Sequence, residues 1–410
     1  MRVLFVSHYF LPEELSIAYL MKELADALAD AGHEVDVLTG FPNWPGGKCF
    51  PGYSANRFSH EKMGKLNVYR IPFRAAPNGT FLQRVLDFKS FEFNARRYGK
   101  KLRRPDLIFV PVPANEDALA ARWLAKHFSC KYVVNVQAIQ PDGAIELGYI
   151  KNSLAIKILR RQERMMYADA SHLLAIGENF RKRLKEKGIP EDKISVLPNW
   201  INADDVAPLD RINLLRREWA IPDDKFVVLY AGTFGRIHGT EILLQAARLL
   251  ANESGILFLM VGQGYDFELC RETVAKECMT NVLVKEFVPR SRLAEMQAIA
   301  DVSVVTLKSG FGHTSVPSKV LGYMSAGRGV LALADENCDT ALLVRAAQCG
   351  AILEPSNVTS LVQKVVALYA DPDLVRVWGE NARNYIVANL DARVVPKKCV
   401  AFLEDIVNGC

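Results

Sequence analysis

The chain has 410 residues, of which 50% are hydrophobic and 24% charged, as in a globular protein that buries a sizeable core in two domains. Its formal net charge of +5 is too small to indicate nucleic acid as a partner. No run approaches the roughly eighteen apolar residues that span a bilayer, and the start MRVLFVSHYF is too quickly polar for a signal peptide, so we expect a cytoplasmic protein.

The first half of the chain predicts a doubly wound parallel sheet. An apolar run at Val3–Ser7 leads through a proline-containing loop to a helical pattern over Tyr19–Ala31, and Glu34–Thr39 follows as a second strand. Such β-α-β units build parallel sheets with right-handed crossovers. The further predicted strands are Leu107–Val112, Tyr132–Val136, His172–Ile176 and Ile194–Leu197.

Two stretches between these strands mix basic residues with aromatic and aliphatic ones. One runs from Phe81 to Arg104, and the other, KNSLAIKILRRQERMMY, runs from Lys151 to Tyr167. Helices of this composition lie on anionic membrane surfaces. Ordinary amphipathic helices that face the core have the same pattern. Both interpretations remain open at this stage.

The second half starts a new series of strands and predicts a second doubly wound sheet. The polar, irregular stretch Pro198–Pro208 is the expected junction. After the last strand, Asp373–Leu390 and Pro396–Val407 are expected helices. The predicted strands are Val227–Ala231, Leu257–Val261, Val282–Glu286, Val302–Thr306, Gly329–Leu333 and Gly350–Leu353.

A glycine-rich turn joins the first strand of this half to a helix. Within Phe226–Ala247, the glycines Gly232, Gly235 and Gly239 allow a ligand to approach the main chain, and the following helix points its free N–H groups back at the turn. The pattern indicates a phosphate site, although glycine turns also serve packing alone.

No metal or disulfide pattern is present. The eight cysteines show no paired close spacing, and the seven histidines do not cluster with them. The sequence therefore indicates neither a zinc site nor a disulfide framework.

The order of motifs along the chain resembles the GT-B glycosyltransferases of family 4. The TGFPNWPGG and VPSK segments are most similar to enzymes that build bacterial capsule, O-antigen or colanic-acid repeat units, including fucosaminyltransferase-type members. The motifs are HYFLPE near the start, LPNW at Leu197–Trp200, YAGTFG at Tyr230–Gly235, VGQG at Val261–Gly264 and SVPSKVLGYMSAGRGVLA at Ser315–Ala332.

The resemblance implies an α/β protein of the GT-B fold, with two Rossmann-like doubly wound parallel-sheet domains facing each other across a cleft. It implies an acceptor-binding domain over residues 1–203, a nucleotide-sugar-binding domain over 204–385, and a terminal helix over 386–410 that crosses back. The implied enzyme is a retaining, metal-independent, hexosyltransferase-type glycosyltransferase without a cofactor. Its expected partners are a nucleotide-sugar donor, UDP-linked, a lipid-linked saccharide acceptor, and the inner membrane as a peripheral surface.

The resemblance also assigns roles to individual residues. Arg236 and Lys319 are expected to neutralise the departing diphosphate, which needs positive charge in the absence of a metal. Ser318 and Lys319 have the alternatives of a helix cap and a solvated lysine. The implied donor-binding residues are Gly232, Thr233, Gly235, His238, Gly262, Gly264, Val288, Ser315, Pro317, Ser318 and Asp339.

The chain departs from the family pattern at several places. Thr233 and His238 stand where many members carry Arg and Lys, and Thr314 and Gly322 stand where many carry two glutamates. The missing sugar-contacting glutamate suggests a deoxy or amino sugar as the donor sugar. Asp339 could take over part of a sugar contact, with a helix cap as an equal alternative.

Acceptor contacts are expected from loops that follow the first-domain strands. Asn135 stands where relatives often show His, and it is expected in the catalytic set. Trp44 could stack on a sugar or anchor its loop, and His8 could carry a proton or stabilise a turn. The predicted acceptor-binding residues are His8, Glu13, Asn43, Trp44, Gln137 and Asp142.

Two other functions fit the same architecture. A nucleotide-sugar epimerase would need acid and base groups and no acceptor. A non-catalytic nucleotide-sugar-binding protein is consistent with the missing glutamates.

Overall fold

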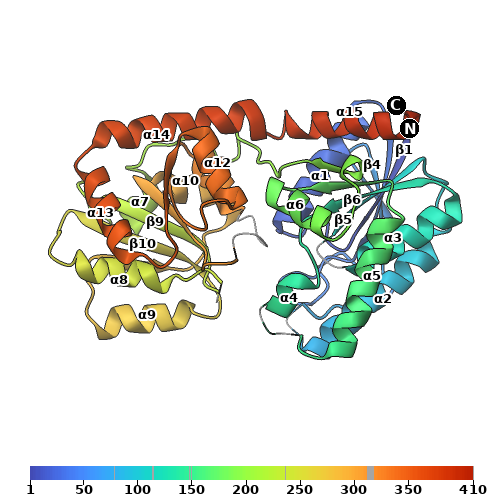
Figure 1. Cartoon of the computed structure of the whole chain (residues 1–410), viewed down its shortest axis with the longest axis horizontal. Helices are drawn as coiled ribbons and strands as arrows, with labels where there is room; N and C mark the ends of the chain where they lie inside the picture. The colour runs from blue at the N-terminus through green and yellow to red at the C-terminus, as the bar shows by residue number, and fades with distance from the viewer. Residues whose placement is uncertain are drawn as a thin grey trace. The chain divides into compact units, whose positions relative to one another are not determined.

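The computed structural model describes residues 1–77, 79–112, 115–146, 148, 150–235, 237–311 and 318–409. It consists of two compact units, one formed by Met1–Asn199 with Arg393–Cys410 and the other by Trp200–Ala392 (Figure 1). The predicted divisions, after residues 203 and 385, lie a few residues from these points. No helix in the described part of the chain has the length and apolar composition to cross a membrane.

The first unit contains an eight-stranded sheet in the order β3-β4-β2-β1-β5-β6-β7-β8, parallel except for the β3–β4 hairpin. The six predicted strands are present. The sequence analysis missed β3 and β4. The edge strand β3 reads SHEKM and has no buried residue, whereas β4 reads LNVYRI and is largely buried. The strands are β1 Arg2–Ser7, β2 Glu34–Gly40, β3 Ser59–Met63, β4 Leu66–Ile71, β5 Leu107–Val112, β6 Lys131–Val136, β7 His172–Ala175 and β8 Ile194–Val196.

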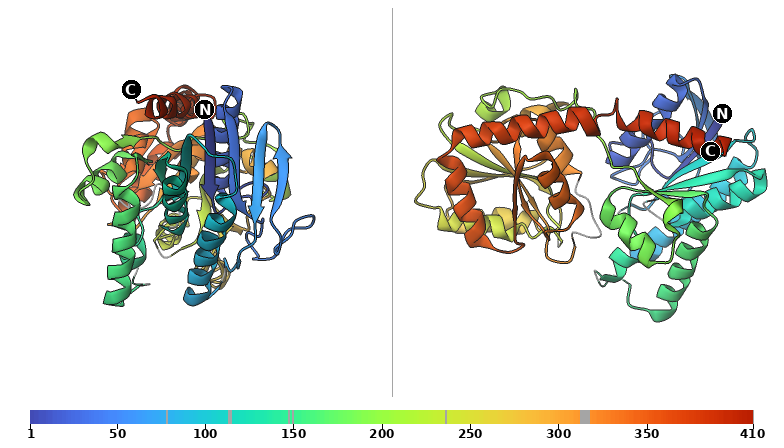
Figure 2. Two further views of the ribbon diagram at one scale, coloured as in Figure 1. Left: turned by 90° about the vertical axis from the view of Figure 1, so that its right-hand side faces the viewer. Right: turned by 45° about the horizontal axis from the view of Figure 1, so that its top comes forward.

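The last helix of the chain packs on the first helix of the first unit. Figures 1 and 2 show α15 beside α1, and the His33 ring lies 2.8 Å from the Glu404 carboxylate. Residues 393–410 therefore belong to this unit although they follow the second one in sequence. The helices are α1 Ser16–Asp30, α2 Phe81–Gly99, α3 Asn115–Phe128, α4 Asp142–Glu146, α5 Ser153–Ala168, α6 Glu178–Glu186, the 3₁₀ turn η1 Glu191–Lys193 and α15 Val395–Asn408.

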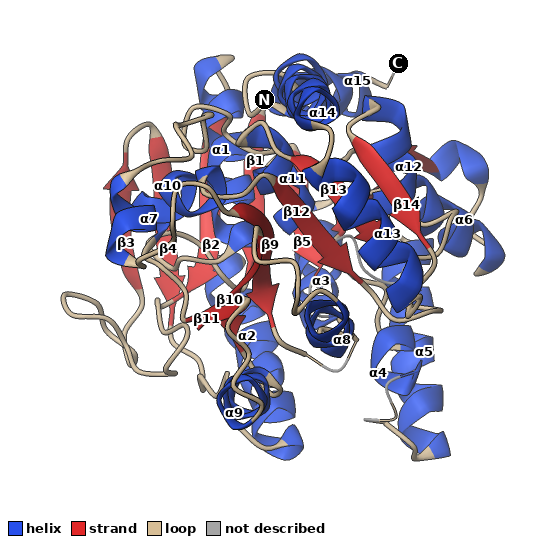
Figure 3. Cartoon of the chain, turned by 90° about the vertical axis from the view of Figure 1, so that its left-hand side faces the viewer, coloured by secondary structure: helices blue, strands red, loops and turns tan. Residues whose placement is uncertain are grey.

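The second unit contains a six-stranded parallel sheet in the order β11-β10-β9-β12-β13-β14, and all six predicted strands are present. Residues of α8 and α13 join the strands in one apolar core. Figure 3 shows this sheet with helices on both of its faces. The strands are β9 Phe226–Thr233, β10 Ile256–Gln263, β11 Val282–Lys285, β12 Val302–Thr306, β13 Gly329–Leu333 and β14 Gly350–Leu353.

The helices of the second unit follow its strands in alternation, as in other doubly wound sheets. They are α7 Leu214–Glu218, α8 Glu241–Leu249, α9 Phe267–Lys276, η2 Arg290–Arg292, α10 Leu293–Ala298, α11 Lys319–Ser325, α12 Asp339–Ala347, α13 Val358–Tyr369, α14 Pro372–Tyr385 and the π-helical turn η3 Ile386–Leu390. Two doubly wound α/β units are therefore confirmed.

Both sheets reverse their strand order next to their first strand. In the first unit β1 lies between β2 and β5, and in the second unit β9 lies between β10 and β12. Ligands of such sheets bind at the carboxyl ends of the strands beside this reversal. The predicted site residues that follow β1, β2, β6, β9 and β10 all lie at these ends.

Candidate functional site

The carboxyl ends of β9 and β10, and the loops that follow them, touch through main-chain atoms. Gly232 and Gly262 are partners in the sheet, and a β-carbon at Gly262 would lie 1.9 Å from the carbonyl oxygen of Gly232. A β-carbon at Gly264 would lie 2.6 Å from the carbonyl oxygen of Phe234. No larger side chain fits at either position without moving the backbone, so these glycines set the shape of the turn.

The turn after β9 ends at Gly239, which has a φ of +60°, and α8 begins two residues later at Glu241. The N–H of His238 donates to the carbonyl of Gly235 over 2.8 Å and tightens the turn. A helix that begins at the carboxyl edge of a sheet directs its free N–H groups toward that edge. Arg236, predicted to lie within this turn, is outside the described residues.

Lys319 is the first residue of α11, and its side chain reaches β9. Its ammonium nitrogen lies 3.0 Å from the phenol oxygen of Tyr230 and 4.2 Å from the centre of that ring. A β-carbon at Gly232 would lie 2.6 Å from the same nitrogen. Burial lowers the pKa of Lys319 to about 7, and no carboxylate among the described residues opposes this shift. The structure thus places a cation without a counter-charge against the glycine turn.

His238 lies beside Lys319 as a neutral ring. Burial, followed by the charge of Lys319, lowers the pKa of His238 to about 4. The imidazole is therefore uncharged at neutral pH, and it does not replace the positive charge that many family members carry there.

Lys308 is a cation near the turn that the sequence analysis missed. It follows β12, its N–H donates to the carbonyl of Ile237 over 2.9 Å, and its stem packs where a β-carbon of Gly239 would point. Its ammonium pairs with Glu241 at 3.1 Å. Its place, two residues after a buried strand that neighbours β9, is the signal that would have identified it.

The other described residues that were predicted to bind the donor lie at the ends of neighbouring strands and helices. Val288 follows β11, and the adjacent Phe287 is 43% exposed. Ser318 is exposed before α11, and its side chain accepts no capping hydrogen bond there. Asp339 begins α12, whose N-cap is Cys338. Thr314, Ser315 and Pro317 lie outside the described residues.

Gly322, where many relatives carry a glutamate, lies beside Gln297, which the sequence analysis did not select. A β-carbon at Gly322 would lie 2.6 Å from the amide nitrogen of Gln297 on α10. Gln297 is buried, and its Oε1 has no hydrogen-bond partner among the described residues. Gln297 therefore fills the space next to this position with an amide instead of a carboxylate.

In the first unit, three amides meet at the carboxyl ends of β6 and β8. Gln137 donates to the side-chain oxygen of Asn135 over 2.6 Å and exchanges hydrogen bonds of 2.8 and 2.9 Å with Asn199. Asn135 and Gln137 were both predicted, and the structure brings them together. Asn199, from the LPNW motif, was not selected.

Glu13 and Asn43 join the loops that follow β1 and β2. The buried carboxylate of Glu13 accepts hydrogen bonds from the N–H groups of Asn43 and Trp44 at 2.9 and 3.0 Å and from the Asn43 amide at 3.3 Å. These contacts hold the loop that carries Trp44. The Trp44 ring is half-buried and lies edge-on to Tyr9.

His8 is enclosed between two aspartates. Its ring nitrogens lie 3.2 Å from Asp87 on α2 and 3.6 Å from Asp117 on α3. Burial alone would lower the pKa of His8, but the hydrogen bonds and charges of Asp117 and Asp87 outweigh it and raise the pKa to about 9. An imidazolium with two buried counter-charges ties β1 to both helices.

Asp142 takes part in an ion-pair cluster. Its carboxylate lies 2.8 Å from Lys187 and 3.2 Å from Arg183, and Lys187 also pairs with Glu163 at 3.0 Å.

Within the described residues, no group of three or more His, Cys, Asp or Glu is arranged to hold a metal ion.

Comparison with protein families places a known domain on each half of the chain. Residues 17–200 match the family described as "Glycosyl transferase 4-like domain", and residues 212–385 match "Glycosyl transferases group 1". Together the two matches cover most of both units.

Individual proteins show the same similarity over the full length. The chain is 26% identical to the "Putative colanic acid biosynthesis glycosyl transferase WcaI" of Escherichia coli (strain K12), over 99% of this chain and 100% of that protein. Its fold is similar to sucrose-phosphate synthase from Thermosynechococcus elongatus, with a TM-score of 0.75, 16% identity and full coverage of both chains. It is also similar to Anabaena HepE in complex with UDP-glucose, with a TM-score of 0.70, 14% identity and 99% of each chain covered.

Proposed function

Because this chain belongs to the glycosyltransferases, with a glycosyl transferase 4-like first half and a group 1 second half on the GT-B fold, we propose that it transfers a sugar from a UDP-linked donor to a lipid-linked saccharide. The acceptor belongs to bacterial surface polysaccharide biosynthesis. Support for this pathway comes from the colanic acid relative, and support for the donor comes from the UDP-glucose complex of HepE.

The observation that carries this proposal is the contact between Lys319 and the glycine turn. The ammonium lies against Gly232 without a carboxylate among the described residues, next to a helix start that favours an anion. A donor diphosphate supplies the negative charge that this arrangement lacks. In the proposal Lys319 and Arg236 neutralise the diphosphate as the sugar–phosphate bond breaks, without a metal ion or cofactor.

The proposed transfer retains the anomeric configuration by front-side attack. The departing diphosphate accepts the proton of the acceptor hydroxyl, and the chain contributes positioning and charge stabilisation. Asn135, held by Gln137, and the half-buried Trp44 are the first-unit groups proposed to orient the acceptor. Thr314, which stands where many relatives carry the sugar-contacting glutamate, supports a donor sugar with a hydroxyl pattern different from that of glucose, such as a deoxy or amino sugar.

An exposed surface of apolar and basic residues supports a lipid-linked acceptor. Four aliphatic side chains near the first turns of α2 and α5 are exposed by 39–66%, and we name them the α2–α5 tip: Leu82, Leu86, Leu154 and Ile158. The two first turns lie at the same end of the first unit (Figures 1 and 2). Exposed basic residues such as Arg84, Lys151 and Lys157 adjoin them. Apolar residues flanked by cations suit the boundary of an anionic, inner-leaflet membrane.

The decisive experiment incubates the protein with a panel of UDP-, GDP- and dTDP-sugars, with and without an undecaprenyl-diphosphate-linked saccharide. We expect transfer from a UDP-sugar that depends on the acceptor and needs no added metal. NMR should show that the product has the same anomeric configuration as the donor. Lys319→Met should abolish transfer, whereas Lys276→Met, an exposed lysine on α9, should not.

Other outcomes decide between the alternatives. Isomerised donor without acceptor would indicate an epimerase. UDP binding without turnover of any donor would indicate a non-catalytic binding protein.

A further inference from the structure

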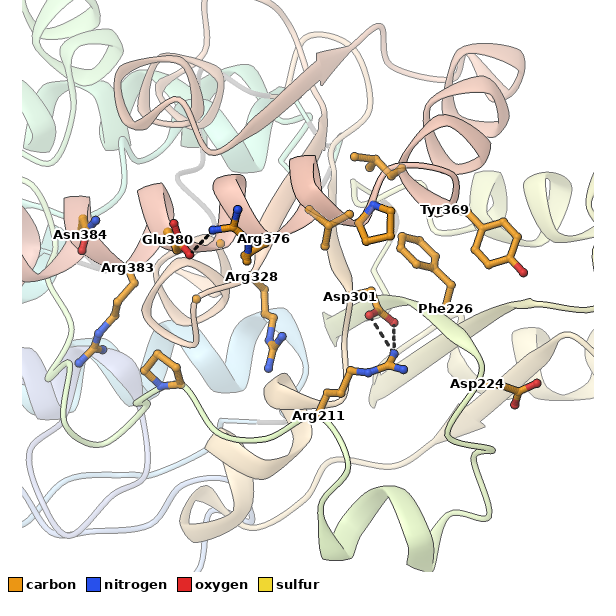
Figure 4. A pocket seen from close by; sticks show the side chains of 16 residues that line it. Arg211, Asp224, Phe226, Asp301, Arg328, Tyr369, Arg376, Glu380, Arg383 and Asn384 are labelled. Atoms are coloured by element: carbon orange, nitrogen blue, oxygen red, sulfur yellow. Dashed lines mark hydrogen bonds and ion pairs between the residues drawn. The ribbon is translucent and has the colours of Figure 1, made fainter.

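A second cavity lies at the opposite edge of the second unit from the glycine turn. It has a volume of about 750 Å³ and is lined by residues at or before the starts of strands, by the end of α13 and by α14 (Figure 4). Phe226 is the first residue of β9, and Asp301 comes directly before β12. Gly232 is near the other end of β9, so roughly 20 Å separate the two sites at about 3.3 Å per residue.

Four arginines line this cavity, and two of them are already neutralised. Arg211 pairs with Asp301 at 2.9 Å and also donates to the carbonyl of Asp223. Arg376 pairs with Glu380 at 2.8 Å. Figure 4 shows both ion pairs. These contacts fix the walls and leave no net positive charge from either pair.

The other two arginines, Arg328 and Arg383, have no ion pair with a carboxylate among the described residues. Arg328 donates from Nη2 to the carbonyl of Leu209, and its buried Nε has no hydrogen-bond partner there. Burial lowers the pKa of Arg328, although the charge of Asp301 partly offsets this. A buried guanidinium N–H without an acceptor is costly, and an anionic ligand would supply an acceptor.

Arg383 likewise uses only one of its guanidinium nitrogens in the described hydrogen bonds. Its described hydrogen bonds all leave from Nη1, to the carbonyls of Ala203 and Ser325 at 2.8 and 3.0 Å and to the Ser325 hydroxyl. Nη2 and Nε keep donor capacity for a ligand. Guanidinium groups suit phosphate and carboxylate because their paired donors match two oxygens.

We propose that this cavity binds a small molecule with two anionic groups, one held by Arg328 and the other by Arg383. Its volume suits a metabolite of the size of a sugar bisphosphate. The walls provide the apolar rings of Phe226 and Tyr369 for the uncharged part of the ligand. Phosphate esters and polycarboxylates share the required chemistry, and the test separates them.

The test uses the full chain carrying Lys319→Ala, so that the glycine turn cannot account for anion binding. Calorimetric titrations at low salt use fructose 1,6-bisphosphate, citrate and, as the neutral match, fructose. We expect one of the two anions to bind with 1:1 stoichiometry and fructose not to bind. Arg328→Gln and Arg383→Gln should each weaken binding roughly tenfold to a hundredfold, as expected for a lost charged hydrogen bond.

Arg376→Gln is the matched control, since this residue lines the same cavity but is already paired. It should change the affinity by less than about twofold if the two unpaired arginines make the contacts. Hydrogen exchange on the parent protein gives a readout that needs no arginine variant. The bound anion should slow exchange in residues 326–329 and α14 but not in residues 232–239. Failure of both anions to bind, affinity that survives both substitutions, or protection only at the glycine turn would overturn the proposal.

Discussion

The ammonium of Lys319 lies 3.0 Å from the phenol oxygen of Tyr230, and a β-carbon at Gly232 would lie 2.6 Å from that same nitrogen. A residue from α11 thus meets a residue of β9 at the point where the strand enters its glycine turn. Neither the phenol nor the turn provides negative charge. The ammonium is positioned for an anion that a ligand brings.

Replacing Lys319 by Met should weaken UDP binding roughly tenfold to a hundredfold, because one charged hydrogen bond to the diphosphate is lost. Tyr230→Phe should have a smaller effect, since the ring remains in place beneath the ammonium. Calorimetric titration with UDP measures both. Equal affinity of the Lys319→Met variant and the unchanged chain would contradict the proposed role.

UDP binding should take up a proton near pH 8. The pKa of Lys319 is about 7 in the folded protein, below its unfolded value of about 10.4, so the amine is mostly neutral at pH 8. The diphosphate favours the charged form and raises this pKa. Titrations in buffers of different ionisation enthalpy would reveal the uptake, which should disappear in Lys319→Met.

The same depressed pKa has a consequence for stability without ligand. Between pH 7 and about 10.4 the unfolded chain binds more protons at Lys319 than the folded chain, so folding stability should rise with pH across this window. Urea unfolding of the second unit, compared between the unchanged chain and Lys319→Met, would isolate this contribution. An identical pH dependence in both proteins would show that the shift is absent.

Gly262→Ala should lower the free energy of unfolding by about 1–3 kcal/mol or more, because the new methyl group meets the carbonyl of Gly232 at 1.9 Å. Gly143→Ala in α4 is a suitable control, since its β-carbon would meet nothing within 4 Å. That change should be neutral or slightly stabilising. If both alanine variants unfold at the same urea concentration, the two loops do not touch as described.

Asp117→Asn should destabilise the first unit by about 3 kcal/mol at pH 6, since it removes one of two buried counter-charges of the His8 imidazolium. The pKa of His8 is raised to about 9, so its contribution is fully present below about pH 6.5 and is lost as the pH rises through 9. The stability difference between the two proteins should therefore shrink from pH 6 to pH 10. A difference that stays constant over this range would contradict a His8 pKa of about 9.

The α2–α5 tip can be tested with vesicles. Leu82→Asn together with Ile158→Asn should reduce binding to vesicles containing anionic lipid more than tenfold, because each buried aliphatic side chain contributes about 1.5–3 kcal/mol. Leu249→Asn, at a residue on α8 that is 63% exposed, is the control. Equal flotation of all three proteins would argue against membrane contact through this tip.

The order of strands and helices was predictable from the sequence because the central strands of both sheets are buried on two faces. β1, β5 and β12 are buried along their entire length and therefore consist mostly of apolar residues. Strand β3 escaped prediction because an exposed edge strand needs no apolar pattern, whereas the largely buried β4 includes the polar residues Asn67 and Arg70. The glycine turn was predictable because two backbone segments in direct contact leave no space for a side chain. Only glycine fits at such a position.

By itself the sequence determined most of the local elements, the β3–β4 hairpin excepted, and the residue types at strand ends. Only the tertiary structure decided which of those residues meet. It brought Lys319 to Gly232, placed Gln297 beside Gly322, and enclosed His8 between Asp87 and Asp117. Burial and the distances between charges set the pKa values of these groups and decide which hydrogen-bond donors have no partner. Burial and these distances depend on residues that are far apart in the chain. The pattern of apolar residues reflects how a single segment is buried, whereas the chemistry of a site depends on contacts between segments that are distant in the sequence.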